Sequence, residues 1–198
     1  MAIRIALITA LICLLGGSVA GAPRRLILVP CGPVPPEVLP VLIKDLPKEL
    51  PAIAAPGPEM PIPPGAYNPG RRQYAADAFL PRLKSFRTSP EDLILGITEA
   101  DLYTPEIDLN FVLGLADRGQ QTAIISLARL HPQFYGLPEN PALFHQRALK
   151  EAVHETGHLL GLGHCDNPKC IMFFSDTIAD TDRKGPGFCQ ECRKSLEK

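Results

Sequence analysis

Residues 154–164 have the sequence HETGHLLGLGH, and this stretch decides how the rest of the chain is interpreted. His154 and His158 are four residues apart, so on a helix both imidazoles lie on one face and can bind one zinc ion. Glu155 follows the first histidine and is placed to contact a water molecule beside that metal. His164 is the predicted third ligand. The pattern HExxHxxGxxH therefore predicts a catalytic zinc site.

The third histidine requires the chain to leave the helix between His158 and His164. Gly161 is the predicted point of departure, because glycine readily adopts the left-handed conformation that ends helices. Three of the five histidines fall in this motif, and His131 and His145 are interpreted as ordinary residues. The alternative is a buried helix whose histidines only form hydrogen bonds. A bare HExxH does occur by chance, but the added glycine and third histidine favour zinc.

Four cysteines follow in two pairs with the spacings C-x4-C and C-x2-C. They are Cys165, Cys170, Cys189 and Cys192. Four thiolates around zinc form a closed tetrahedral site with no position for water, so the predicted second zinc ion is structural. Two disulfides are the alternative, because an exported protein permits them. A thioredoxin-like redox pair is favoured least, since no βαβ pattern precedes the second pair.

A methionine lies between the two cysteine pairs. Met172 comes eight residues after His164. In zinc peptidases of the metzincin clan, a methionine in a tight turn forms an apolar floor under the metal, and this Met-turn role is predicted here. The alternative is an ordinary core methionine.

The string HETGHLLGLGHCDNPKCIM, followed by CQEC, resembles the archaemetzincin family, whose pattern is HExxHxxGxxHCx4CxM and then CxxC. The segments RRLILVPCG, RRQY, ILGITEADLY, NFVLGLAD and SLARL also resemble parts of that family, so the resemblance extends from about Arg24 onward. It implies a metzincin-like peptidase with two zinc ions per chain, one catalytic and one structural. It does not imply a particular substrate.

Length and charge limit the other possibilities. The 198 residues and the hydrophobic fraction of 45% suit one domain with a substantial core. The formal net charge is −1 and no basic stripe stands out, which argues against a nucleic-acid partner. The expected partner is a peptide or protein substrate, and the expected oligomeric state is a monomer.

The first 22 residues have the composition of a signal peptide. A short positive region precedes the apolar run Ile5 to Leu15, and small residues follow. The apolar run is short for a membrane span, so an uncleaved anchor is only the alternative. We therefore expect a periplasmic or secreted protein with the domain at residues 23–198 and no stable membrane association after cleavage. Cys31 then stays outside the zinc sets, as a buried thiol at a strand end.

Hydrophobic patterns predict the remaining elements. Strands are expected at Leu26–Val29, Leu93–Ile97, Phe111–Leu115 and Ala123–Leu127, helices at Pro35–Leu50, Arg71–Phe86 and Pro141–Leu160, and an extended loop at Pro56–Gly70. Together they predict a single-domain α/β fold of the metzincin type, with a mixed twisted sheet and a long active-site helix. The Met-turn and the four-cysteine zinc site follow near the C-terminus.

The predicted function is hydrolysis of peptide bonds by a metal-activated water, with Glu155 as general base. The substrate is expected to lie extended beside an edge strand at Asn110–Ala116. Tyr103 and Tyr135 could assist the oxyanion, although packing roles are favoured for both. Two alternatives stay open: a zinc-dependent amidase acting on a non-peptide substrate, and a catalytically silent zinc protein that binds peptides.

Overall fold

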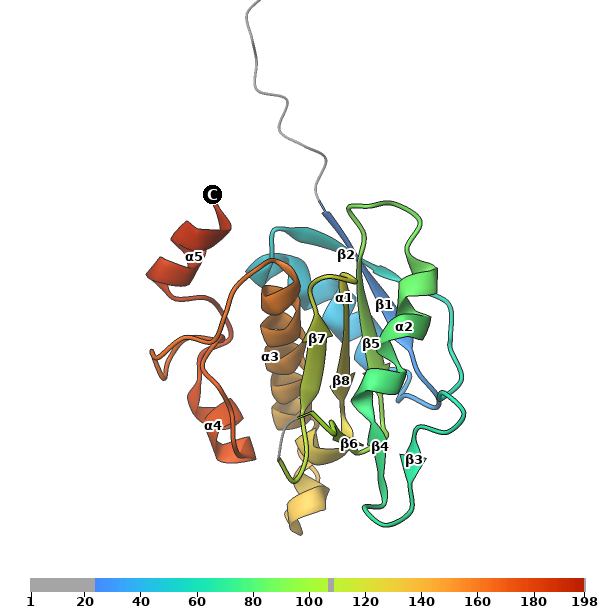
Figure 1. Cartoon of the computed structure of the whole chain (residues 1–198). Coiled ribbons are helices and arrows are strands. Elements are labelled where there is room, and N and C mark those ends of the chain that lie inside the picture. Colours follow the sequence, from blue (N-terminus) through green and yellow to red (C-terminus); the bar gives the residue numbers. More distant parts are fainter. Residues whose placement is uncertain (1–23, 107–108, 198) are drawn as a thin grey trace, which may run out of the picture.

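The computed structural model of the chain describes residues 24–106 and 109–197 (Figure 1). The predicted signal segment, residues 1–22, lies outside these ranges. In the described part of the chain, no helix has both the length and the apolar character that crossing a membrane requires.

A mixed sheet forms the centre of the fold, with strand order β2-β1-β5-β8-β7. Its first four strands are parallel, and β7 runs antiparallel to β8 at one edge. Every residue of β5 and β8 is buried, as expected for parallel strands covered on both faces. The strands are β1 (Arg24–Pro30), β2 (Ala52–Pro56), β5 (Leu93–Thr98), β7 (Gly114–Asp117) and β8 (Thr122–Ser126).

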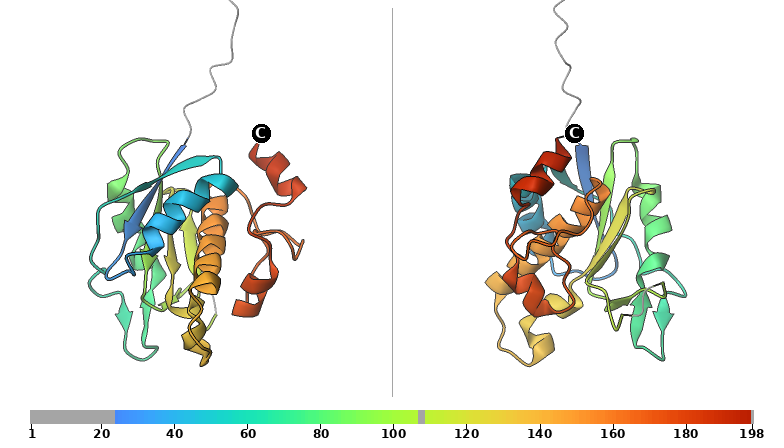
Figure 2. Two further views of the ribbon diagram at one scale, coloured as in Figure 1. Left: turned by 180° about the vertical axis from the view of Figure 1, so that it is seen from behind. Right: turned by 60° about the vertical axis from the view of Figure 1, so that its left-hand side comes forward.

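Helices cover both faces of this sheet (Figure 2). On one face pack α1 (Val38–Glu49) and α3 (Pro141–Leu159), and on the other lies the short helix α2 (Leu80–Leu83). Side chains of β1 alternate accordingly, because Leu26 and Leu28 belong to the core under α1 and α3, whereas Val29 belongs to the core under α2. The α/β class with a mixed sheet is as predicted.

The long helix α3 is well defined at both ends. The Asn140 side chain accepts a hydrogen bond of 3.0 Å from the backbone N–H of Leu143, and Pro141 occupies the first turn, where its missing N–H costs nothing. After Leu159 the chain turns at Gly161, whose φ is +101°. The helix and its glycine exit therefore agree with the prediction for Pro141–Leu160.

The predicted helix Arg71–Phe86 is wrong in its first part. Gln73–Ala75 forms strand β4 of a small second sheet with the order β3-β4-β6, where β3 is Tyr67–Asn68 and β6 is Leu102–Tyr103. The buried Gln73 amide donates to Asp101 Oδ2 and to the Asn110 carbonyl, contacts that no local pattern indicates. Two 3-10 turns, Ala76–Ala78 and Lys84–Phe86, flank α2.

Other boundaries differ by a few residues. Strand β2 was not predicted. The predicted strand Phe111–Leu115 begins only at Gly114, because Val112 instead forms an isolated bridge with Leu102. The segment Pro56–Gly70 is largely extended loop, as expected, but it includes β3.

The C-terminal segment lies against α3 on the side away from the sheet (Figures 1 and 2). It contains α4 (Ile178–Arg183) and α5 (Gln190–Leu196). Elsewhere in the fold, two 3-10 turns, Ala128–Leu130 and Pro132–Tyr135, connect β8 to α3. A reciprocal capping box of Thr177 and Asp180 fixes the start of α4. Helix α3 is thereby held between the sheet and this segment.

Candidate active site

Two of the three motif histidines have a fixed orientation and tautomer. His154 Nδ1 lies 2.8 Å from the Ile171 carbonyl oxygen, and His158 Nδ1 lies 2.9 Å from that of Leu162. A carbonyl oxygen can only accept, so both Nδ1 atoms carry the proton and both Nε2 atoms keep a free lone pair. This is the arrangement that metal-binding histidines adopt, with one nitrogen held by the protein and the other left for the ion.

These two lone pairs lie close together on the α3 side of the cleft. His154 Nε2 and His158 Nε2 are 3.2 Å apart, although neither can donate to the other. Tetrahedral zinc with Zn–N bonds of about 2.0–2.1 Å separates its nitrogen ligands by roughly 3.3 Å. The separation therefore fits a shared zinc ion.

His164 completes the cluster from the loop after Gly161. Its ring centroid lies 5.4 Å from that of His154 and 4.9 Å from that of His158, and one ligand atom from each of the three lies within 4.8 Å of the others. The Phe174 ring packs against it at 4.9 Å. The structure thus gathers all three predicted histidines, from a rigid helix and from the loop that follows it.

Burial keeps the histidine cluster neutral. Desolvation, with a further contribution from the Lys184 charge, holds the pKa of His154 well below its usual value. Desolvation also lowers the pKa values of His158 and His164. Neutral imidazole is the form that binds metal, so the site suits a cation at neutral pH.

Glu155 lies beside the histidines, with its carboxyl group against the edge strand. Gly114 of β7 allows this approach, because a Cβ at that position would lie 2.5 Å from Glu155 Oε1. The pKa of the Glu155 carboxyl is raised to about 8, chiefly by burial and also by the nearby Glu151 charge, while the Lys184 charge acts in the opposite direction. A carboxyl group whose pKa lies near neutrality can both take up and release a proton.

A buried ion pair lies one helical turn before Glu155. Lys184 Nζ is 3.2 Å from Glu151 Oε1, and both side chains are almost completely buried. The hydroxyl of Thr181 in α4 donates to the same Glu151 oxygen at 3.0 Å. These contacts attach the C-terminal segment to the active-site helix.

Met172 lies in a tight turn beneath the histidines. Its backbone carbonyl accepts from the Cys165 N–H at 2.9 Å, and the Phe173 N–H donates to the Cys170 carbonyl at 3.0 Å. The Met172 side chain is fully buried against Gly157 of α3, where a Cβ would collide with its sulfur. Gly157 thus allows the methionine to pack close to the helix that carries His154.

The four cysteines form a separate cluster beside this turn. The Sγ atoms of Cys165 and Cys189 are 3.8 Å apart, and those of Cys170 and Cys192 are 3.7 Å apart. These distances exceed the disulfide bond length of about 2.05 Å, and all four are free thiols. Tetrahedral zinc with Zn–S bonds of about 2.3 Å separates its sulfurs by roughly 3.8 Å, which fits.

One of these thiols favours the charged form that binds zinc. Hydrogen bonds, chiefly from the Cys192 backbone at the start of α5, lower the pKa of the Cys189 thiol to about 7, whereas burial raises the pKa of the Cys192 thiol. Thiolates are the ligands that zinc requires. The donor set and its spacing therefore agree with a four-thiolate zinc site.

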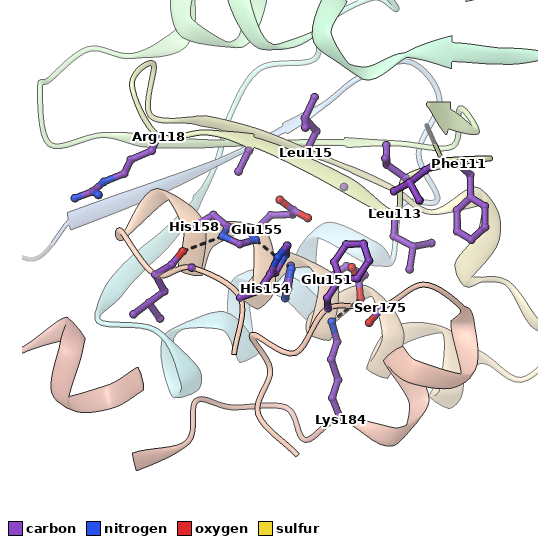
Figure 3. Close-up of a pocket in the computed structure, with 18 of the residues that line it drawn as sticks. Phe111, Leu113, Leu115, Arg118, Glu151, His154, Glu155, His158, Ser175 and Lys184 are labelled. Atoms are coloured by element: carbon purple, nitrogen blue, oxygen red, sulfur yellow. Dashed lines mark hydrogen bonds and ion pairs between the residues drawn. The ribbon is translucent and has the colours of Figure 1, made fainter. Parts of the chain in front are cut away.

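A cleft of about 450 Å³ opens over the histidines between β7 and α3 (Figure 3). One wall is formed by residues 111–116, and the other by the histidines, Glu155, Phe174, Ser175 and Lys184. Most of the predicted substrate segment Asn110–Ala116 thus lines the cleft, although Asn110 itself does not. Tyr103 and Tyr135 do not line it either, and the Tyr135 hydroxyl donates to the Arg129 carbonyl.

Cys31 is remote from both clusters. It is buried in the core under α2, where desolvation raises the pKa of its thiol to about 12. The prediction of a buried thiol at a strand end is therefore confirmed.

The sequence profile of Peptidase family M54 matches residues 43–198 of this chain. The chain belongs to peptidase family M54. An archaemetzincin of Methanocaldococcus jannaschii is 43% identical over 173 residues, which are 87% of this chain and 93% of that protein. An archaemetzincin of Pyrococcus furiosus is 50% identical over 133 residues, covering 67% of this chain and 68% of that protein.

A solved structure leads to the same family. The crystal structure of a zinc-dependent peptidase from Methanocorpusculum labreanum superposes with a TM-score of 0.79 at 32% identity, covering 86% of this chain and 99% of that one. The resemblance to archaemetzincins and the metzincin-like fold are confirmed. The expected class of enzyme, a zinc metallopeptidase, is confirmed at the level of the M54 family.

Several cleft residues were not predicted from the sequence. Glu151 lies four residues before Glu155 on α3, and that helical spacing was a usable signal. Lys184 and Ser175 fall in the spacer between Met172 and Cys189, where no pattern distinguishes them. Their places depend on how the C-terminal segment packs against α3.

Proposed function

We propose that this M54 member hydrolyses peptide bonds in the cleft between β7 and α3, with Glu155 as general base. The observation that carries the proposal is the pair of unprotonated Nε2 atoms 3.2 Å apart, beside a buried carboxyl group and facing a cleft. A silent binding protein has no need of a carboxyl group with a raised pKa at that place.

The three histidines would hold one zinc ion, and Cys165, Cys170, Cys189 and Cys192 a second. The first ion would make a water molecule acidic enough to attack at neutral pH and would polarise the scissile carbonyl. The second site offers four ligands and no open position, so its role is to fix the loop that carries His164 and Met172.

Glu155 performs the proton transfers. Its carboxylate takes a proton from the attacking water and later gives it to the leaving amine. The contact with Gly114 holds the carboxyl group between the edge strand and the histidines, close to where a scissile bond would lie. Removing this one carboxylate therefore affects the reaction without removing a metal ligand.

Strand β7 positions the substrate. It is one of the two edge strands of the main sheet, and its first three residues line the cleft. An extended peptide can pair its main chain with such an edge, which places its carbonyl groups in a regular register above the histidines. Phe111 and Leu113 give this wall an apolar character suited to side chains (Figure 3).

The decisive experiment is cleavage of a mixed peptide library by the purified zinc-loaded chain, read by mass spectrometry. Glu155→Ala should lose activity by on the order of 1000-fold while its melting temperature and zinc content stay unchanged. Undiminished cleavage by this variant would remove Glu155 from the mechanism. A parental chain that binds peptides but cuts none would instead favour the amidase or the silent binding protein.

We further propose that residues 1–22 direct export and are cleaved, and that the mature domain works as a monomer. N-terminal sequencing of the protein recovered outside the cytoplasm and light scattering of the purified domain test these two statements. An intact N-terminus in a membrane fraction would support the anchored alternative.

A further inference from the structure

Lys184 is a buried cation whose ammonium group lacks a full set of partners. Its side chain is 0% exposed, and its Nζ lies 3.2 Å from Glu151 Oε1. That contact is an ion pair without hydrogen-bond geometry, and within residues 24–106 and 109–197 Nζ has no hydrogen-bond acceptor. An ammonium group carries three N–H donors, and burying them without acceptors is unfavourable.

A second donor without a partner lies in the same wall of the cleft. Ser175 Oγ is buried, and nothing in the described part of the chain forms a hydrogen bond with it. Ser175 and Lys184 both line the cleft that contains His154 and Glu155. In Figure 3 the Lys184 side chain extends toward Glu151, with Ser175 beside it.

The other cations behind this wall have hydrogen-bond partners. Arg147 forms two hydrogen bonds of 2.7 Å with the Asp182 carboxylate. The ammonium of Lys150 donates to two backbone carbonyl groups of α4, at 2.9 and 3.0 Å. Lys184 differs from both, because its ammonium lies near the Glu151 carboxylate but has no hydrogen-bond acceptor in the described part of the chain.

A carboxylate matches these features better than any neutral group. Its two oxygens can accept from the Lys184 ammonium and the Ser175 hydroxyl at once, and its negative charge strengthens the hydrogen bond from the ammonium. A side-chain amide offers the ammonium one neutral oxygen, and an aliphatic group offers none, so both match these two donors less well than a carboxylate.

We propose that Lys184 and Ser175 form a subsite for a carboxylate group of the substrate adjacent to the scissile bond. The enzyme then selects peptides that present an aspartate or glutamate side chain, or a terminal carboxylate, at that place. This selectivity rests on the proposed function, because it assumes that the cleft binds peptides. Lys184 and Ser175 determine specificity, and the proton transfers remain with Glu155.

The test measures binding, so that it does not depend on turnover. Fluorescent peptides that differ only in Asp against Asn, Glu against Gln, or a free against an amidated C-terminus are titrated against the zinc-loaded Glu155→Gln chain. The acidic member of a pair should bind about 10-fold more tightly, the usual scale for a hydrogen bond to a charged group. The side-chain pairs and the terminal pairs show which carboxylate is recognised.

Variants in the same Glu155→Gln background assign the preference to the subsite. Lys184→Met should abolish it, and Ser175→Ala should weaken it several-fold. Because Lys184→Met leaves the Glu151 carboxylate unpaired, Glu151→Gln combined with Lys184→Met removes both charges and preserves the fold. Lys194→Met, at a side chain that is 55% exposed on α5, is the charge-matched control and should keep the preference.

Each outcome is decisive. Equal affinity for acidic and amide peptides, or a preference that survives in the double variant, overturns the subsite. A preference for acidic peptides that Lys184→Met abolishes supports the subsite. This holds even if the parental chain cleaves no peptide, because that result overturns only the proposed hydrolysis. If the parental chain cleaves peptides but shows no preference for acidic ones, the proposed hydrolysis stands and the subsite is overturned. If no peptide binds at all, both the subsite and the proposed hydrolysis are overturned.

Discussion

The histidine cluster and the cysteine cluster are adjacent in the chain, since Cys165 directly follows His164. They differ in the elements that carry them, because two of the histidines lie on a long helix whereas the cysteines come mainly from loop segments. Two histidines are fixed on one face of α3 by backbone carbonyl groups, and the cluster faces a cleft. The cysteines come from a loop and from the start of α5, and they contact one another.

The difference separates two uses of the same metal chemistry. A site on a prebuilt helix does not need its ion in order to fold, so the ion is free to serve the reaction. A site made from loop segments has little else to hold it, so its ion contributes to folding. Substitutions in the two clusters should therefore have different consequences.

The largest expected effect is on turnover in the histidine cluster. His158→Ala should reduce peptide cleavage by on the order of 1000-fold, because one metal ligand is lost, while the melting temperature changes by only a few degrees. Activity assays and thermal unfolding of the same preparation check this. If the variant unfolds at room temperature, the histidine cluster is as structural as the cysteine cluster and the distinction disappears.

In the cysteine cluster the effect should fall on stability first. Cys189→Ser should lower the melting temperature by roughly 10 °C and expose the C-terminal segment to proteases, because a closed metal site contributes folding free energy. Calorimetry and limited proteolysis measure both. A variant that melts with the parental protein would show that the C-terminal segment is held by contacts such as Lys184–Glu151 alone.

A smaller effect sharpens the comparison within the cleft. Gly114→Ala should reduce turnover by about 10-fold and change the melting temperature less than Cys189→Ser does, because the new methyl group would lie 2.5–2.7 Å from Oε1, Cγ and Cδ of Glu155 and so displaces that side chain. Gly70→Ala, at an exposed glycine that does not line the cleft, is the matched control. Parental turnover in Gly114→Ala would mean that Glu155 does not work from the position next to β7.

The parts of the molecule that sequence reasoning predicted well are those fixed by local spacing. The i, i+4 relation of His154 and His158 and the glycine exit at Gly161 depend on a few consecutive residues, and the structure has both. The fold class followed from the order of apolar runs and from the family resemblance.

The parts that were missed depend on distant partners. Residues 73–75 belong to the stretch Arg71–Phe86, whose apolar side chains recur with a helical period, but they form a strand that pairs with β3 and β6. Lys184 has no sequence signature, and only the packing of the C-terminal segment against α3 places its ammonium near Glu151. Long-range pairing and buried charge are thus the features that the sequence alone did not predict.

The order of the two cysteine pairs along the chain has a consequence for synthesis. Ribosomes make the chain from its N-terminus, so the three histidines and Glu155 are complete before Cys189 and Cys192 have been added. Until Cys189 and Cys192 are added, the four-cysteine site that would fix the loop carrying His164 and Met172 is incomplete. On the structural role proposed for the cysteine cluster, a nascent chain that ends before Cys189 would therefore have the three histidines and Glu155 without the loop geometry that brings His164 to the other two.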